Sequence, residues 1–160
     1  MKDSKAPVTA AIRVLRQHQA EWSDHLYDYE EKGGTAVSSR ELGVDEHAVI
    51  KTLIMEDDAK RPLIVLMHGD REVSTKNLAR HLGVKGITPC TPEVANRHSG
   101  YMVGGTSPFG TKRAMPVYLQ QSICALPQIY LNGGKRGYLI GISPQAVVAI
   151  LKPELVDVMA

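Results

Sequence analysis

Two runs of β-branched and aliphatic residues, 49–55 and 63–67, lie on either side of the polar, proline-containing segment 56–62. Runs of this length and composition are typical of strands, and a polar segment with a proline is typical of the turn between them. The pattern therefore predicts a central β-hairpin against which the other elements must pack.

Helix signals lie before and after this hairpin. Apolar residues recur with the spacing of an amphipathic helix over residues 8–19. Ser74, Thr91 and Ser143 can each cap a first helical turn, because a side-chain hydroxyl accepts a hydrogen bond from an otherwise unpaired amide. The predicted helices are 8–19, a short one capped by Ser38 or Ser39 and ending at Gly43, 74–81 closed by Gly83, one opening at 91–93, and 143–151.

Short strand patterns fill much of the remaining chain. They cover 25–29, 101–103, 116–119, 128–131 and 138–142. Because helices and strands alternate irregularly, without a strict βαβ rhythm, we predict an α+β fold with a mixed sheet and helices packed outside it. No repeat, low-complexity tract or linker interrupts the sequence, so a single domain is expected over residues 1–160.

The charge balance excludes recognition of nucleic acid by bulk electrostatics alone. The chain has 19 Lys plus Arg and 17 Asp plus Glu, a net charge of +2, so any RNA contact has to be local. No run has the length and apolar character of a signal peptide or a membrane span. With two cysteines, Cys90 and Cys124, and no C-x-x-C spacing, a reducing cytoplasm is the expected location.

Neither a metal nor a cofactor is predicted. The six histidines, at positions 18, 25, 47, 68, 81 and 98, show no metal-binding spacing. The order Gly110-Thr111-Lys112 differs from the Gly-Lys-Ser/Thr of a phosphate-binding P-loop. Nothing near Cys90 in the sequence indicates a histidine partner that would make it a nucleophile.

Lys51 is the most informative candidate site residue. Period-2 alternation places it inside the first aliphatic run, on one face with Val49 and Leu53. Burial disfavours an ammonium ion, so a lysine there either pairs with an anion or serves a site. The alternative is an exposed face, or an alkyl stem that covers apolar surface while the ammonium reaches water.

Two glycine-rich segments are candidate binding loops. In residues 104–110, glycines let a ligand approach main-chain amides, which can bind a phosphate or a developing oxyanion. Residues 132–137 join two predicted strands and carry Lys135 and Arg136, cations suited to phosphate oxygens. A surface turn and a solvated hairpin tip are the alternative interpretations of these segments. With Lys112-Arg113, the two segments would form one basic rim.

The chain resembles the YbaK/EbsC family in three features that occur in this order: the strand lysine in 49–53, the segment 99–108 and the segment 133–137. Members of that family resemble the editing domain of bacterial prolyl-tRNA synthetases. The resemblance covers nearly the whole chain. It implies a mixed, mostly antiparallel, barrel-like domain that cleaves the ester between an amino acid and the 3′-terminal adenosine of tRNA. The substrate it implies first is Cys-tRNA(Pro).

The resemblance also implies roles for individual residues. Lys51 would hold the terminal phosphate or the ester carbonyl, and amides between Gly104 and Pro108 would position the aminoacyl carbonyl. The candidate catalytic residues are Lys51, Gly104, Gly105 and Pro108, and the candidate substrate-binding residues are Tyr29, Thr106, Ser107, Asn132, Gly133, Gly134, Lys135 and Arg136.

Asn132 and Leu139 depart from the cysteine-type pattern, which has serine and an acidic residue at these positions. Removal of alanine or another small amino acid is therefore the alternative activity. A non-catalytic module that binds aminoacyl-tRNA or a synthetase, and a Schiff-base enzyme that uses Lys51, are alternatives of other classes. Because the chain is too small to include an obvious anticodon-reading domain, tRNA identity is expected to come from a partner, prolyl-tRNA synthetase.

Overall fold

The predicted hairpin forms the centre of the larger of two sheets in the computed structural model, which describes residues 6–160. β2 (Ile50–Asp57) and β3 (Pro62–His68) pair antiparallel, with Ile50 opposite His68 and Glu56 opposite Pro62. Every residue of β3 is buried, which explains why this run shows no alternation of polar and apolar residues. The hairpin prediction is confirmed.

The strands form a larger mixed sheet and a smaller antiparallel sheet, and most strand pairs are antiparallel. The larger sheet has the order β4-β2-β3-β5-β8 and the smaller one the order β1-β7-β6. β5 runs parallel to β3, and β8 runs parallel to β5, whereas the other pairs are antiparallel. The remaining strands are β1 (Ser23–Leu26), β4 (Ile87–Pro89), β5 (Val117–Gln120), β6 (Ile129–Lys135), β7 (Tyr138–Ile142) and β8 (Glu154–Val156).

The α+β prediction is confirmed, but the expected barrel-like closure is not found among residues 6–160. The two sheets stay separate and are joined by one isolated bridge, between Val49 and Tyr130. The larger sheet ends at each side in a strand of three residues, β4 and β8, which is too short to continue the pairing into a closed barrel.

Four helices of the described chain begin at hydroxyl caps, and the sequence predicts three of these caps, Ser74, Thr91 and Ser143. Thr9, Ser74, Thr91 and Ser143 each accept a hydrogen bond from a first-turn amide. Gly83 ends the third helix in the left-handed conformation, at a φ of 71°. The helices are α1 (Ala10–Gln17), α2 (Gly34–Leu42), α3 (Thr75–Leu82), α4 (Pro92–Ser99) and α5 (Pro144–Leu151), with short 3-10 turns η1 (Glu46–Ala48) and η2 (Gln121–Ala125).

The start of α2 was wrong in the sequence prediction, although its end at Gly43 is confirmed. Neither Ser38 nor Ser39 is a cap, because the helix begins earlier and both lie inside it. Their hydroxyls donate to the carbonyls of Thr35 and Ala36, three residues back. A serine inside a helix can satisfy its hydroxyl in this way, so it does not by itself mark a helix start.

The predicted strand at 101–103 is also absent from the described chain, and the predicted strand at 25–29 ends at Leu26. Tyr101 is buried in a loop instead of a strand. Its hydroxyl donates to the carbonyl of Phe109 and its own carbonyl accepts from Asn96, so the backbone here is satisfied by loop contacts.

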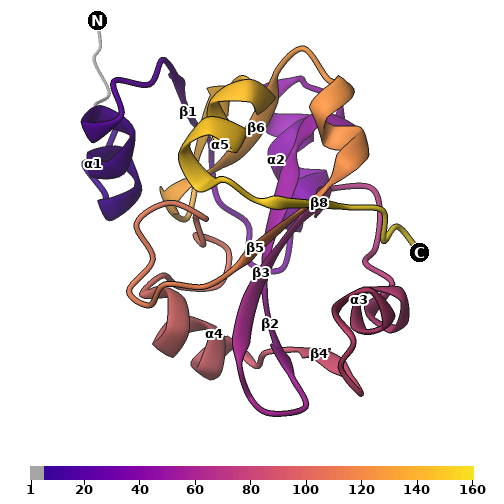
Figure 1. The fold of residues 1–160 in the computed structure, drawn as a ribbon. Coiled ribbons are helices and arrows are strands. Elements are labelled where there is room, and N and C mark those ends of the chain that lie inside the picture. The colour runs from indigo at the N-terminus through magenta and orange to yellow at the C-terminus, as the bar shows by residue number, and fades with distance from the viewer. Residues whose placement is uncertain (1–5) are drawn as a thin grey trace, which may run out of the picture.

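Two hydrophobic cores cover opposite faces of the larger sheet. One lies between the two sheets and includes Ile64, Leu66 and Ile140, together with residues of α1 and α5. The other packs Val65 and Met67 against α3. In Figure 1, α1 and α3 accordingly lie on opposite sides of the molecule, with β2 and β3 between them. Both faces of the central hairpin are therefore covered.

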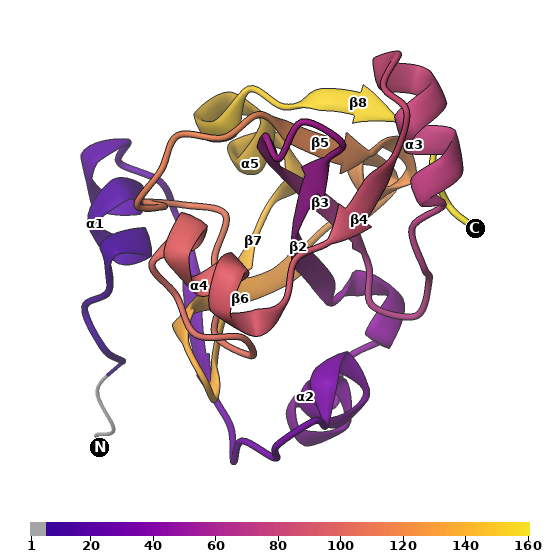
Figure 2. The same ribbon diagram turned by 90° about the horizontal axis from the view of Figure 1, so that it is seen from below.

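One edge of β2 is only partly paired. β4 pairs with β2 over Met55–Asp57, and the Cys90 amide donates to the carbonyl of Ile54 at 3.0 Å. Over residues 50–53 no strand of the described chain pairs with this edge. Figure 2 shows the edge from below, with α4 and β6 on one side of it and α2 beyond its lower end. We call residues 50–53 the open edge of β2.

Candidate active site

A cavity of about 730 Å³ lies beside the open edge of β2. Its walls come from the segment 27–35, α2, the start of α4, the loop around Gly104, and strands β6 and β7. The volume lies in the range of about 300–1,000 Å³ that is typical of small-molecule sites. Elements far apart in the sequence therefore meet around one space of ligand size.

Lys51 lines this cavity from β2. Its side chain is 19% exposed, and its ammonium donates to the carbonyl of Arg71 and lies 3.5 Å from the carboxylate of Glu72. The ammonium is thus neither fully solvated nor unpaired. The sequence left open whether Lys51 pairs with an anion or serves a site, and in the structure it pairs with Glu72 and also lines the cavity. Glu72 is 82% exposed, so this ion pair is a weak, water-accessible one.

Tyr29 and Gly104 touch each other across the cavity wall. Gly104 has a φ of +90°, and a Cβ built there would lie 2.4 Å from the Tyr29 hydroxyl oxygen. Only glycine accommodates both that backbone conformation and that contact. The guanidinium of Arg136 lies over the Tyr29 ring, 5.1 Å from its centre, and its Nε donates to the carbonyl of Val103 at 2.9 Å. Tyr29 is therefore held between the glycine-rich loop and Arg136.

Asn132 links the two glycine-rich segments directly. Its Nδ2 donates to the carbonyl of Gly104 at 2.9 Å, and its Oδ1 accepts from the amides of Gly134 and Lys135. The pairing of β6 with β7 shifts register between Asn132 and Lys135, so Asn132 fills the irregularity in the strand. The prediction that 132–137 is a loop between strands is corrected here, because residues 132–135 belong to β6.

The predicted site residues fall into two groups. Those that line the cavity are Tyr29, Lys51, Gly104, Thr106, Asn132 and Arg136. Those that do not line it are Gly105, Ser107, Pro108, Gly133 and Gly134, and Lys135, which is exposed.

The second group packs the two segments together. A Cβ on Gly105 would lie 2.8 Å from the Arg136 amide nitrogen, and one on Gly133 would lie 2.4 Å from the Tyr138 ring. The Ser107 hydroxyl is fully buried and accepts from the Phe109 amide. The Gly105 amide already donates to the carbonyl of Met102, so it is engaged within the loop.

Several cavity residues were missed by the sequence analysis as site residues. Thr52, Val37 and Ser38 line the cavity, and Leu139, noted only as a departure, lines it with 4% exposure. Within residues 6–160 the buried hydroxyl of Thr52 has no hydrogen-bond partner. The neighbouring Lys51 was the signal that could have pointed to Thr52. Nothing in the sequence of α2 pointed to the cavity, because the place of this helix beside the cavity depends on long-range packing.

Two other cavity residues have altered acidity. Burial, assisted by the neighbouring Tyr29, raises the pKa of Tyr27, so that its hydroxyl stays protonated at neutral pH. Burial and the charge of Glu56 raise the pKa of Cys90 to about 11. A protonated thiol is a poor nucleophile, which agrees with the sequence analysis, where nothing indicated that Cys90 is a catalytic nucleophile.

Solved structures show the same fold. A protein described as a proposed trans-editing enzyme for prolyl tRNA synthetase superposes with a TM-score of 0.82 at 19% identity, over 98% of this chain and 99% of that one. A hypothetical protein superposes with a TM-score of 0.87 at 20% identity, over 95% and 100%. At these identities the likeness establishes the fold.

The aminoacyl-tRNA editing domain family matches residues 30–150, and the chain belongs to this family. The EbsC protein of Enterococcus faecalis, named as a proposed Cys-tRNA(Pro)/Cys-tRNA(Cys) deacylase, is 27% identical over 94% of this chain and 92% of its own. The proline–tRNA ligase of Moorella thermoacetica is 31% identical over 64% of this chain, but over only 18% of the ligase. The resemblance to the YbaK/EbsC family is confirmed.

None of the helices described in residues 6–160 is both long and apolar enough to cross a membrane.

Proposed function

We propose that this protein is a trans-editing deacylase that cleaves the ester of mischarged tRNA, with Cys-tRNA(Pro) as the leading substrate. The observation that carries the proposal is the meeting of Lys51, Tyr29 and the Gly104 loop on one ligand-sized cavity, in a chain of the aminoacyl-tRNA editing family. The aminoacyl group and the 3′-terminal adenosine would occupy this cavity.

Lys51 is proposed to hold the ester carbonyl or the terminal phosphate. Its present partner Glu72 is exposed and weakly bound, so an oxygen of the substrate can replace it at little cost. The carbonyl of Arg71 would continue to orient the ammonium. An ammonium that is fixed in place and only partly exposed stabilises a developing negative charge more strongly than one in bulk water.

The reaction needs no dedicated side-chain base, because the aminoacyl ester is already activated. A water molecule adds to the carbonyl carbon, the ester carbon–oxygen bond breaks, and the ribose oxygen takes up the proton. With a cysteinyl substrate the substrate thiol can be the nucleophile instead, so that a thiolactone leaves and the thiol proton passes to the ribose oxygen. Orientation and stabilisation of the oxyanion then supply the catalysis.

Alanine is the second candidate for the amino acid removed, and Leu139 is the observation that favours it. Leu139 gives the cavity a buried apolar wall where the cysteine-type pattern has an acidic residue. The side chain of Asn132 is already bound to main-chain atoms. An apolar pocket distinguishes small side chains by only about 1–3 kcal/mol of binding free energy per methylene, so both cysteinyl and alanyl groups would enter the cavity.

We further propose that the protein works in the cytoplasm and that prolyl-tRNA synthetase supplies the tRNA identity. The similarity to part of a proline–tRNA ligase supports the proposal that both proteins act on the acceptor end of proline tRNA. Four exposed cations lie on the two glycine-rich segments or next to them, where they would contact phosphates of the acceptor end: Lys112, Arg113, Lys135 and Arg136.

The test is a deacylation assay with proline tRNA charged separately with cysteine, alanine, serine and proline. Selective loss of one mischarged species, with Pro-tRNA(Pro) spared, is expected and names the substrate. A folded sample that binds charged tRNA but releases no amino acid from any of them would favour the alternative, a non-catalytic binding module.

A further inference from the structure

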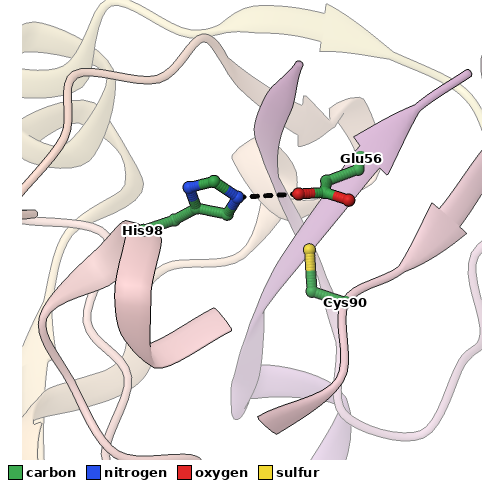
Figure 3. Close-up of side chains that lie close together, drawn as sticks. All are labelled: Glu56, Cys90 and His98. Carbon is green, nitrogen blue, oxygen red and sulfur yellow. Dashed lines mark hydrogen bonds and ion pairs between the residues drawn. The ribbon is translucent and has the colours of Figure 1, made fainter. Parts of the chain in front are cut away.

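Three side chains that are distant in sequence meet beside the cavity: Glu56 from β2, Cys90 from the segment after β4, and His98 from α4 (Figure 3). One ligand atom of each, a carboxylate oxygen, Sγ and a ring nitrogen, lie within 4.8 Å of one another. The His98 side chain is 5% exposed and that of Glu56 15%, and Cys90 lines the cavity. The three side chains are therefore largely shielded by protein, and Cys90 can be reached from the cavity.

Cysteine, histidine and glutamate are the residue types that bind Zn²⁺, and three protein ligands with a fourth position left open is the arrangement of many reactive zinc sites. With bonds of about 2.0–2.3 Å, tetrahedral ligand atoms lie roughly 3.3–3.8 Å apart. Closing the cluster onto an ion thus needs side-chain shifts of about 1 Å. We propose that Glu56, Cys90 and His98 form a Zn²⁺ site whose open position faces the cavity.

The charges around the cluster suit a divalent cation. Zn²⁺ bound to a thiolate, a carboxylate and a neutral imidazole is a neutral unit, so it can be held where a lone charge could not. The partly buried carboxylate of Glu56 at present has the His98 Nε2–H as its partner, at 2.8 Å. An ion between the two would replace this bond with direct ligation to both groups.

Arg113 controls whether His98 is free to bind. Its Nη1 lies 3.1 Å from Nδ1 of His98, and because a guanidinium can only donate, this contact fixes the imidazole proton on Nε2, the nitrogen that faces Glu56. The arginine residue is exposed, so its side chain can turn into solvent and let the proton move to Nδ1. The Arg113–His98 contact therefore weakens metal binding by His98 but does not prevent it.

A metal here would tie α4 to the centre of the larger sheet. Pro92 and Ala95 of α4 line the same cavity, so the ion would fix one of its walls. This proposal departs from the sequence-based expectation of no metal, which considered spacing along the chain. Spacing could not show the site, because Cys90 lies 34 positions after Glu56 and His98 lies eight positions after Cys90.

Zinc uptake by the full chain, without tRNA, tests the proposal independently of deacylation. Protein stripped with a chelator is dialysed against Zn²⁺ and its metal content measured, and Co²⁺ absorption reports thiolate ligation. We expect one equivalent per chain, a higher Tm with Zn²⁺, and loss of both in Cys90→Ser and His98→Gln. Cys124→Ser and His81→Gln are the matched controls that should keep binding.

Arg113→Ala separates ligation from a merely structural role of the cluster. Freeing Nδ1 of His98 should tighten Zn²⁺ binding about tenfold, whereas loss of a structural hydrogen bond would not. Circular dichroism shows whether each variant is folded. If His98→Gln does not fold, the comparison of Cys90→Ser with Cys124→Ser decides the test. Absence of uptake by the wild-type chain, or equal uptake by Cys90→Ser and Cys124→Ser, would overturn the proposal.

Discussion

The Nδ2 of Asn132 donates a hydrogen bond to the carbonyl of Gly104 at 2.9 Å, and this contact joins two segments that lie 28 residues apart. The same side chain accepts from the Gly134 and Lys135 amides through Oδ1. One amide group therefore sets both the shape of β6 and the position of the glycine-rich loop at the cavity.

Asn132→Asp separates these two tasks. Aspartate keeps an acceptor for the two amides but places a carboxylate oxygen against the Gly104 carbonyl, where a donor is needed. We expect a clear fall in deacylation with little loss of stability. Asn132→Ala removes all three bonds and should also lower the free energy of unfolding by about 1–3 kcal/mol, measured by urea titration. Equal activity of the aspartate variant and the wild type would contradict the role of this contact.

Gly104→Ala should lower activity through Tyr29. The added Cβ would lie 2.4 Å from the Tyr29 hydroxyl, so the ring has to leave the cavity wall. Gly83→Ala is the matched control, because Gly83 also has a positive φ, of 71°, but has no atom within 4 Å of the added Cβ. Both variants should lose about 1 kcal/mol of stability from backbone strain, and only Gly104→Ala should lose deacylation. A similar rate loss in both would refute the Tyr29 contact.

The hairpin and the caps were predictable because their signals are local. Ser74, Thr91 and Ser143 each act on an amide within three residues, so the sequence contains the whole interaction. The strand predicted at 101–103 failed because Tyr101 is satisfied by Phe109 and Asn96 in a loop, an outcome that alternation does not reveal. Tertiary contacts decide such short segments.

The site was only partly predictable for the same reason. Lys51 and the glycine-rich segments could be identified one by one, but their distances depend on how β2 and β6 pack together. Leu139 shows the limit clearly, since β7 pairing and not the local sequence sets it in the cavity wall. The contribution of α2 could not be foreseen, because no local pattern relates Val37 to the edge of β2.

Thr52→Val should stabilise the free protein. The Thr52 hydroxyl is buried without a partner in the described chain, and an unsatisfied polar atom costs about 1–3 kcal/mol. Replacing it with a methyl group of similar size should raise the free energy of unfolding by about 1 kcal/mol in urea titration. If substrate supplies the missing partner, the same variant has a higher KM. A destabilised variant would show that the hydroxyl is satisfied in solution.

Asp57 should make the stability of the β2–β3 hairpin depend on pH. Hydrogen bonds, first of all that from the Arg61 amide, lower the pKa of the Asp57 carboxyl in the folded protein although burial opposes them. Stabilisation by a lowered pKa is complete above the unfolded-state value, about 3.9, and is lost as the pH falls through the folded-state value. Asp57→Asn should therefore be less stable than wild type at pH about 7, and the difference should shrink at pH about 3.

The control for this experiment is Asp28→Asn, which removes a carboxylate at an exposed position. Urea titrations of the three proteins at both pH values give the comparison. A stability difference for Asp57→Asn that does not change with pH would contradict the assignment.

The most direct measurement of the proposed activity is the single-turnover rate of ester cleavage by Lys51→Ala, with the substrate that the charged-tRNA assay selects. Lys76→Ala, an exposed lysine of α3 outside the cavity, is the matched control. We expect Lys51→Ala to be folded and slower by about 100-fold or more, as when one oxyanion donor is removed, and Lys76→Ala to equal the wild type. A folded Lys51→Ala that cleaves within about threefold of the wild-type rate would contradict a catalytic role for the cavity lysine.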